Sequence, residues 1–405
     1  MRFAMPVLVL VLAACSSTSG ASAPDASPPV DDGGIDATAA TACENFSRAT
    51  FAVDGAGPDS QIHAIGAAGG DRVFVAYNRP KTGGKTFDVY LAAFGCDGKP
   101  VFDPVRVSDD SDNDVDPSIA VQGSEILVAW AGDAAGKEPN LHVRVRRFDR
   151  QGQARGAATA FTGPRKGIAN LTNNIWQASI APLGGGFAIT GAWGVDEAPA
   201  FQTFGSRLDV TGAPVGDAFD LGFDAGTTQT SVDVASNGVA AWAAWLVEPN
   251  TADGQSVATA TFGATGALTR GPTLANANSP SVAMNGTTSW VAAQRGAKDV
   301  VLQRLDAAGD AVVLAGKGML PALALSGEGG AFAAYRDVAG GRTIVITRID
   351  AAGSPLGETD LALTDAAPYP LRLVRVAADA YFLAFQSGKS PALRAQGRFV
   401  DLRTK

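Results

Sequence analysis

Short apolar runs, separated by glycine or polar residues, recur along this chain at the length of β-strands. In residues 117–152 the runs read IAVQG, EILVAW and LHVRVRRF, and β-branched and aromatic residues are frequent in them. The middle run is apolar at consecutive positions, which predicts a strand that is covered on both faces of its sheet. Residues 117–152 therefore predict three antiparallel strands followed by a tight turn.

Imperfect copies of this unit follow one another to the end of the sequence, and seven can be counted. Six of them end in a recognisable turn, which reads FGCDG (94–98), FDRQG (148–152), LDVTG (208–212), FGATG (262–266), LDAAG (305–309) and IDAAG (349–353). The closing glycines are 54, 60, 54, 43 and 44 residues apart. A weaker strand follows each turn, for example residues 101–108. Four-stranded units at this spacing are typical of the blades of a β-propeller.

The two ends of the chain predict how the ring closes. The seventh copy stops near residue 401, before an outer strand can form, whereas residues 49–53 (ATFAV) are an apolar segment that precedes the first copy. We expect this N-terminal segment to complete the last blade, which would leave no free sheet edge there. The predicted fold is all-β: a seven-bladed β-propeller of four-stranded blades, closed by the N-terminal strand.

An aromatic residue ends the second strand of six of the seven copies: Tyr77, Trp130, Trp193, Trp245, Tyr335 and Phe385. We expect these rings to pack between adjacent blades. A ring of aromatic side chains that stacks on sugars is the alternative interpretation.

The first fifteen residues, MRFAMPVLVLVLAAC, combine one early positive charge with an apolar run that is too short to span a bilayer as a helix. The segment Leu12-Ala13-Ala14-Cys15 resembles the lipobox of bacterial lipoproteins. The resemblance implies that residues 1–14 are a signal peptide and that Cys15 is acylated after cleavage. An ordinary cleaved signal with a coincidental cysteine is the alternative.

Residues 15–42 contain mostly Ser, Ala, Pro, Gly and Asp, so they cannot bury enough apolar surface to fold. We expect a flexible tether with a reach of about 25–30 Å. The predicted organisation is a signal peptide (1–14), a lipidated tether (15–42) and the propeller (43–405).

Charge excludes one class of partner. The chain has 32 Lys and Arg against 40 Asp and Glu, a net charge of −8, so no basic stripe is available to neutralise nucleic acid phosphates.

Only Cys43 and Cys96 remain after the lipid site. Cys43 precedes the expected outer strand of the last blade, and Cys96 lies in a turn of the neighbouring first blade. A Cys43–Cys96 disulfide would lock the ring closure in an exported protein.

Residues 109–116, DDSDNDVD, bring four carboxylates together just before the inner strand of the second blade: Asp110, Asp112, Asp114 and Asp116. Their alternation resembles the start of a calcium-binding loop. The loop lacks the glycine and the distal glutamate of an EF-hand. Calcium is therefore the possible cofactor, and a solvated acidic loop is the alternative.

The third unit is the longest because of the insertion at residues 162–176, TGPRKGIANLTNNIW. It combines positive charge with amide and aromatic side chains, a mixture suited to a polar ligand such as a glycan: Arg165, Lys166, Asn173, Asn174 and Trp176. An elaborated loop without a ligand is the alternative.

Catalytic motifs are not evident. His63 and His142 lie in predicted strands of different blades, and no GxSxG, P-loop or HExxH sequence occurs. As a whole the sequence resembles secreted bacterial propeller lipoproteins. We expect a monomeric lipoprotein anchored through Cys15, facing the cell envelope and carried by the outer membrane, which binds an envelope protein or glycan. The alternative function is a carbohydrate-active hydrolase or lyase.

Overall fold

The computed structural model describes residues 46–55, 62–81, 86–109, 113–133, 141–161, 171–195, 201–222, 226–249, 254–327, 329–339, 341–361, 371–388 and 393–403. The chain divides into two units at residue 31, and all described residues lie in the second unit. No helix among them is long and apolar enough to cross a membrane.

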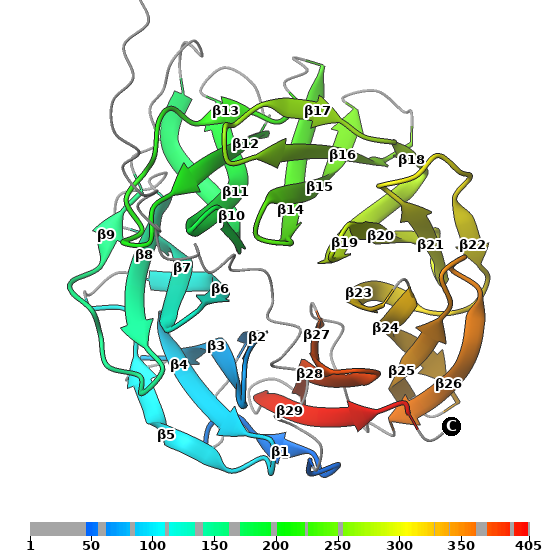
Figure 1. Cartoon of the computed structure of the whole chain (residues 1–405), viewed down its shortest axis with the longest axis horizontal. Coiled ribbons are helices and arrows are strands. Elements are labelled where there is room, and N and C mark those ends of the chain that lie inside the picture. Colours follow the sequence, from blue (N-terminus) through cyan, green and yellow to red (C-terminus); the bar gives the residue numbers. More distant parts are fainter. Residues whose placement is uncertain are drawn as a thin grey trace, which may run out of the picture. The chain divides into compact units, whose positions relative to one another are not determined.

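Seven antiparallel sheets stand around one axis, each with its first strand innermost (Figure 1). Blade one contains β2 (Ile62–Gly69), β3 (Arg72–Pro80), β4 (Phe87–Gly95) and β5 (Pro100–Arg106). Blade two contains β6 (Asn113–Gln122), β7 (Glu125–Asp133), β8 (Leu141–Asp149) and β9 (Thr159–Ala160). Blade three contains β10 (Leu171–Leu183), β11 (Gly186–Val195), β12 (Phe201–Leu208) and β13 (Phe219–Asp220).

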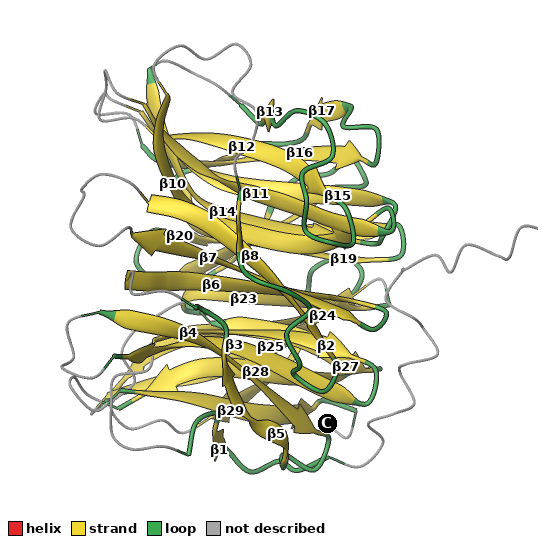
Figure 2. Ribbon diagram, turned by 90° about the vertical axis from the view of Figure 1, so that its left-hand side faces the viewer, coloured by secondary structure: helices red, strands yellow, loops and turns green. Residues whose placement is uncertain are grey.

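The remaining blades follow the same order around the ring. Blade four has β14 (Thr227–Ser236), β15 (Ala240–Pro249), β16 (Ser256–Gly263) and β17 (Leu268–Arg270), with a further short strand, β18 (Leu274–Ala275), on β16. Blade five has β19 (Ala277–Asn285), β20 (Thr288–Arg295), β21 (Asp299–Arg304) and β22 (Val312–Leu314). Blade six has β23 (Met319–Ser326), β24 (Gly329–Val338), β25 (Gly341–Ile349) and β26 (Pro355–Leu361). The predicted seven-bladed propeller is confirmed, and Figure 2 shows the ring from the side.

Blade seven is built from both ends of the chain, as predicted. It has β27 (Arg372–Ala377), β28 (Ala380–Ser387) and β29 (Arg394–Asp401), and β1 (Phe51–Ala52) completes it. Phe51 pairs with Gly397 in antiparallel register, and the Val53 amide donates to the Ala395 carbonyl at 3.0 Å. The outer edge of β29 is therefore covered by backbone from the opposite end of the sequence.

The core consists of seven apolar clusters between adjacent blades rather than one central cluster. The aromatic residues that end the second strands belong to these clusters and are nearly inaccessible: Tyr77, Trp130, Trp193, Trp245, Tyr335 and Phe385. This confirms the packing interpretation and excludes a sugar-stacking ring formed by these side chains. Each blade buries its two faces only against its neighbours, so closing the ring removes two otherwise exposed faces from water.

The closing turns owe their shape to glycine and aspartate. Gly98, Gly152, Gly212, Gly266 and Gly353 have φ between 77° and 82°, a conformation that costs other residues energy. In the second copy the Asp149 carboxylate accepts hydrogen bonds from the amides of Gln151 (3.0 Å) and Gln153 (2.8 Å). The side chain thus replaces backbone partners inside the turn.

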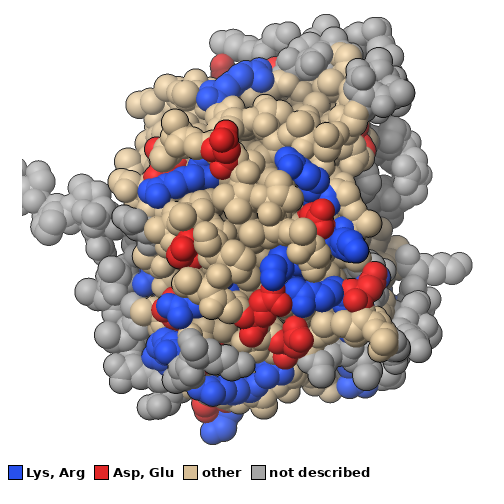
Figure 3. Space-filling model, turned by 90° about the vertical axis from the view of Figure 1, so that its right-hand side faces the viewer, with Lys and Arg blue, Asp and Glu red and all other residues tan. Residues whose placement is uncertain are grey.

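The outer surface carries mixed charge on the side of the ring that bears β22 and β26 (Figure 3). Glu358 of β26 contacts Lys317 and, at 3.1 Å, Arg336. Alternating charges of this kind favour solubility and do not form a single-sign patch on this face.

Candidate functional site

A β-bulge interrupts most inner strands at the same level and turns side chains toward the axis of the ring. The register shifts between residues 62 and 65, 115 and 118, 176 and 179, 230 and 233, 278 and 281, and 319 and 322. Five non-glycine residues at these bulges have φ of 50–52°: Asp116, Gln177, Ser231, Ser279 and Leu320. Positive φ strains such residues by roughly 1–3 kcal/mol each and is concentrated at functional sites.

A row of residues, five polar and one alanine, follows directly after the bulges, and we call it the polar row: Ser118, Ser179, Asp233, Ser281, Ala322 and Arg372. The first five are the residues at which pairing with the second strand resumes, and Arg372 is the first residue of β27. Each row member thus comes from a different inner strand.

The polar row links the inner strands of neighbouring blades. Oγ of Ser118 accepts the Ile180 amide at 3.0 Å, and Oγ of Ser179 accepts the Val234 amide at 3.3 Å. Oδ2 of Asp233 accepts the Val282 amide at 2.9 Å, and Oγ of Ser281 accepts the Leu323 amide at 3.1 Å. These hydrogen bonds satisfy buried amides that no sheet partner could reach.

Arg372 and Asp233 form an ion pair between blades seven and four. Nη1 of Arg372 donates to Oδ1 of Asp233 at 2.8 Å, and the same oxygen accepts Oγ of Ser179 at 3.3 Å. The side chains are 23% and 12% exposed, so the pair is shielded from solvent but not sealed from it. A charge-assisted hydrogen bond in such a place is stronger than one at an open surface.

On the side of the polar row that faces the loops between blades, a cavity opens, which we call the polar cavity. It encloses about 1020 Å³ including its open mouth, and the bulge residues line it together with Asp233, Ser281 and Arg372. The amide of Ser231 donates to Oε1 of Gln177 at 2.5 Å, which fixes the Gln177 side chain against blade four. Hydroxyl, amide, carboxylate and guanidinium groups therefore converge on one space, beside apolar Leu320, Leu371 and three prolines.

The predicted acidic site is only partly described. Asp110 and Asp112 lie outside the described residues. Asp114 is buried on β6, where it accepts the Trp130 indole at 2.7 Å, and Asp116 lines the polar cavity. Among the described residues no three potential metal ligands come together, so calcium stays a prediction.

The predicted insertion site is also partly described. Arg165 and Lys166 lie outside the described residues, whereas Asn173, Asn174 and Trp176 belong to the first half of β10. The backbone of Trp176 directly precedes Gln177, so this segment leads into the polar cavity. Ligand contact by these five residues stays a prediction.

Only one of the two cysteines of the predicted Cys43–Cys96 disulfide belongs to the described residues. Cys96 lies in the turn between β4 and β5, while Cys43 lies outside the described residues. The Ser47 amide donates to the Cys96 carbonyl at 3.0 Å, which brings the N-terminal segment to this turn. The pairing of Cys96 with Cys43 stays a prediction, as does acylation of Cys15.

Sequence reasoning missed Arg372, Asp233, Gln177, Ser231 and Ser279. A signal was present for two of them, because Arg372 and Asp233 are charged residues inside apolar inner strands. The other three are uncharged polar residues whose position in the cavity depends on the bulge.

Similarity to known proteins extends only to the fold. No family model matches the sequence, and the comparison with curated proteins gives no significant match. Among solved structures, a protein of unknown function from Dyadobacter fermentans has a TM-score of 0.54 at 11% identity and covers 87% of this chain and 98% of its own. A Hadza microbial sialidase has a TM-score of 0.50 at 11% identity, and the match covers 78% of this chain and 74% of the sialidase. A Penicillium chrysogenum alpha-L-arabinanase has a TM-score of 0.46 at 12% identity, and the match covers 72% of this chain and 94% of the arabinanase. At these identities the likeness defines the class as a β-propeller and assigns no activity.

Proposed function

We propose that this protein is an exported, lipid-anchored binding protein that holds a hydroxyl-rich ligand, such as an envelope glycan, in the polar cavity. The observation that carries the proposal is the Arg372–Asp233 ion pair set among the bulge residues of five blades. Function on such a scaffold resides in the site and not in the fold.

The composition of the polar cavity suits a sugar. Gln177, Ser231 and Ser279 offer short hydroxyl and amide groups, which form directional hydrogen bonds with ligand hydroxyls. Leu320 and the neighbouring prolines offer apolar surface for the C–H faces of a pyranose. A mostly apolar wall with a few convergent polar groups is the usual composition of a small-molecule site.

The ion pair gives the site an acceptor and a donor at fixed positions. Asp233 is held by Val282 and Ser179 as well as by Arg372, so its carboxylate is already oriented before a ligand enters. A ligand hydroxyl that donates to Asp233 and accepts from Arg372 loses little rotamer entropy on the protein side. Preorganisation of this kind favours binding of a rigid polyhydroxylated molecule.

Acylation of Cys15 is the part of the proposal that rests on sequence alone. The lipobox-like segment and the polar tether support attachment to a membrane of the cell envelope, with the propeller held outside the bilayer. Mass spectrometry of the N-terminal peptide from cells should show a diacylglyceryl-modified Cys15. An unmodified mature terminus at another residue would contradict the anchor without affecting the binding site.

Binding is tested by titration calorimetry of the propeller against a panel of neutral and acidic envelope oligosaccharides. Arg372→Ala should lower the affinity for the tightest-binding oligosaccharide about tenfold or more, since one charge-assisted hydrogen bond is worth roughly 1.5–3 kcal/mol. Arg336→Ala on the outer surface, which contacts Glu358, is the matched control and should bind as the unaltered protein does. Equal affinity in both variants would refute the site.

Glycoside hydrolysis is the second candidate, because the polar cavity contains two carboxylates, Asp116 and Asp233, on different blades. Most glycoside hydrolases use such a pair, and a microbial sialidase shares the fold at a TM-score of 0.50. Release of 4-methylumbelliferone from a panel of glycosides, lost in Asp116→Asn or Asp233→Asn, would favour the enzyme. Sugar binding without release would favour the binding protein.

A further inference from the structure

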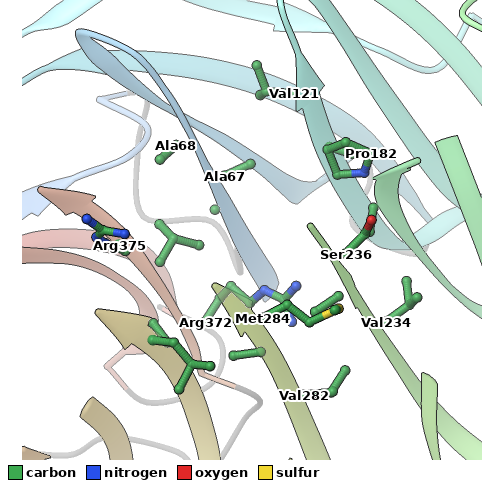
Figure 4. Close-up of a pocket in the computed structure, with 18 of the residues that line it drawn as sticks. Ala67, Ala68, Val121, Pro182, Val234, Ser236, Val282, Met284, Arg372 and Arg375 are labelled. Carbon is green, nitrogen blue, oxygen red and sulfur yellow. The ribbon is translucent and has the colours of Figure 1, made fainter. Parts of the chain in front are cut away.

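The hairpin side of the central channel forms a second cavity with a different chemistry, which we call the apolar cavity. It encloses about 890 Å³ including its opening and is lined by Ala, Val, Ile, Leu and Met side chains from six inner strands and by β27. Figure 4 shows Val121, Val234, Val282 and Met284 around this space. Only two of the lining residues are charged, and both are arginines: Arg372 and Arg375.

The two arginines lie at different depths. The next level after the polar row lies three residues further along each inner strand. At this level every inner strand except β27 places an uncharged residue in the wall of the apolar cavity: Ala68, Val121, Pro182, Ser236, Met284 and Leu325. Blade seven presents Arg375 at this level. Three residues of strand separate Arg375 from Arg372, a distance of about 10 Å along the channel.

The arginines also differ in how their charge is balanced. Asp233 neutralises Arg372. Nη1 of Arg375 donates to the amide oxygen of Asn285 at 3.0 Å, and its Nε lies 3.4 Å from the Ala377 carbonyl. Within the described part of the chain no carboxylate is within ion-pair distance of Arg375. A half-buried guanidinium on an apolar wall is favourably completed by an anion.

From this geometry we infer that the apolar cavity binds an organic monoanion with an unbranched apolar body, such as a medium-chain carboxylic acid. The carboxylate accepts hydrogen bonds from Arg375 near the first hairpins of the blades. The apolar body extends toward the polar row, past Met284 and Val234, and ends before the Arg372–Asp233 pair. A body of about 10 Å fills the distance between the two arginines, which matches the length of decanoate.

Two features of the cavity favour this ligand over other small molecules. The wall offers few hydrogen-bond partners apart from Ser236, Asn285 and the two arginines, so a sugar would lose hydration without recovering it. An organic cation would meet two guanidinium groups. An apolar anion satisfies both the wall and Arg375.

The test is titration calorimetry of the intact folded chain with decanoate below its micelle concentration. Decanoate should bind one to one, and decanol and decyltrimethylammonium should bind at least tenfold more weakly. Arg375→Gln should weaken decanoate by about 10- to 100-fold, the equivalent of one charge-assisted hydrogen bond. Arg375→Lys should restore part of the affinity because it keeps the charge.

Arg342→Gln is the matched control, since Arg342 of β25 contacts Asp337 outside the channel, and it should bind decanoate as the unaltered protein does. Shortening decanoate to octanoate should weaken binding about fourfold for each methylene removed. Val121→Trp, which fills the apolar cavity, should abolish binding while circular dichroism stays unchanged.

The inference is overturned if decanol binds as tightly as decanoate, or if Arg375→Gln and Arg342→Gln have equal affinities. The inference does not depend on the proposed glycan site. The effect of Arg372→Ala on sugar affinity tests the glycan site, and the effect of Arg375→Gln on decanoate affinity tests the apolar cavity.

Discussion

Replacing Phe51 with alanine tests whether the N-terminal strand holds the ring closed. The Phe51 ring lies 4.7 Å from that of Phe94 in blade one, and 6.1 Å from those of Phe382 and Phe399 in blade seven. It therefore contacts both sheets that meet at the closure. Its side chain is only partly buried, so part of its surface stays in water.

The expected loss of stability follows from these contacts. Fully buried Phe→Ala substitutions cost about 3–5 kcal/mol, and partial exposure of Phe51 places this one near the lower end, at about 3 kcal/mol. For a domain of about 360 residues with an unfolding entropy of roughly 2.1 cal/mol/K per residue, 3 kcal/mol lowers the Tm by about 4 °C.

Differential scanning calorimetry measures this shift, and Leu356→Ala is the control. Leu356 is also apolar and on an outer strand, but it is 56% exposed on β26, so its replacement should lower the Tm by less than about 1 °C. Hydrogen exchange should in addition show faster exchange of β29 amides in Phe51→Ala. Equal Tm values for the two variants would refute the role of Phe51 in closure.

Three further predictions concern charges and the disulfide. The side-chain hydrogen bond from Arg403, against an opposing effect of burial and with help from Arg48, holds the pKa of Asp401 below its ordinary value. The Asp401 carboxylate therefore stabilises the fold at neutral pH, and this stabilisation is lost as pH falls below about 4. In urea titrations, Asp401→Asn should lose less stability on acidification than the unaltered protein does. Cys96→Ser should destabilise the fold by about 2–4 kcal/mol in non-reducing urea titrations, and peptide mapping should find Cys96 joined to Cys43. A double-mutant cycle on Arg372 and Asp233 should give a coupling energy of about 1–2 kcal/mol, between the values for exposed and buried pairs.

The architecture was predictable from the sequence because its signals are local and repeated. A run of alternating or continuous apolar residues defines a strand, and the glycine of each closing turn, with an aspartate in five of the six, marks where the third strand ends. Repetition made each weak signal reliable. Ring closure followed from a missing strand at residue 401 and a surplus one at residues 49–53, and both expectations are confirmed by the pairing of β1 with β29.

The chemistry of the channel was not predictable in the same way. Arg372 and Asp233 are 139 residues apart, and their contact exists only because seven blades close a ring. The bulges place non-glycine residues such as Gln177 and Ser231 at positive φ, a conformation that their sequence does not favour.

The sequence Arg-apolar-Asp, which recurs at residues 207–209, 304–306 and 348–350, shows the same limit of local reasoning. It predicts a structural pair within each blade, and Arg304 does contact Asp306 at 3.0 Å. Arg348 instead contacts Asp379 of the next blade at 2.9 Å. The same local sequence thus has a different partner in different blades.

If all blades were identical, their inner strands would place the same side chain in the channel at any given depth. A blade that places a different side chain there indicates selection for something other than folding. Asp233 replaces a serine or alanine in the polar row, and both channel arginines come from β27. Placing a guanidinium on an apolar inner strand costs desolvation energy that packing does not return. Asp233 compensates Arg372 within the protein, whereas the neutral Asn285 is the side-chain partner of Arg375. The first arginine therefore serves to divide the channel into a polar and an apolar half, and the second is placed to meet a charge that a ligand supplies.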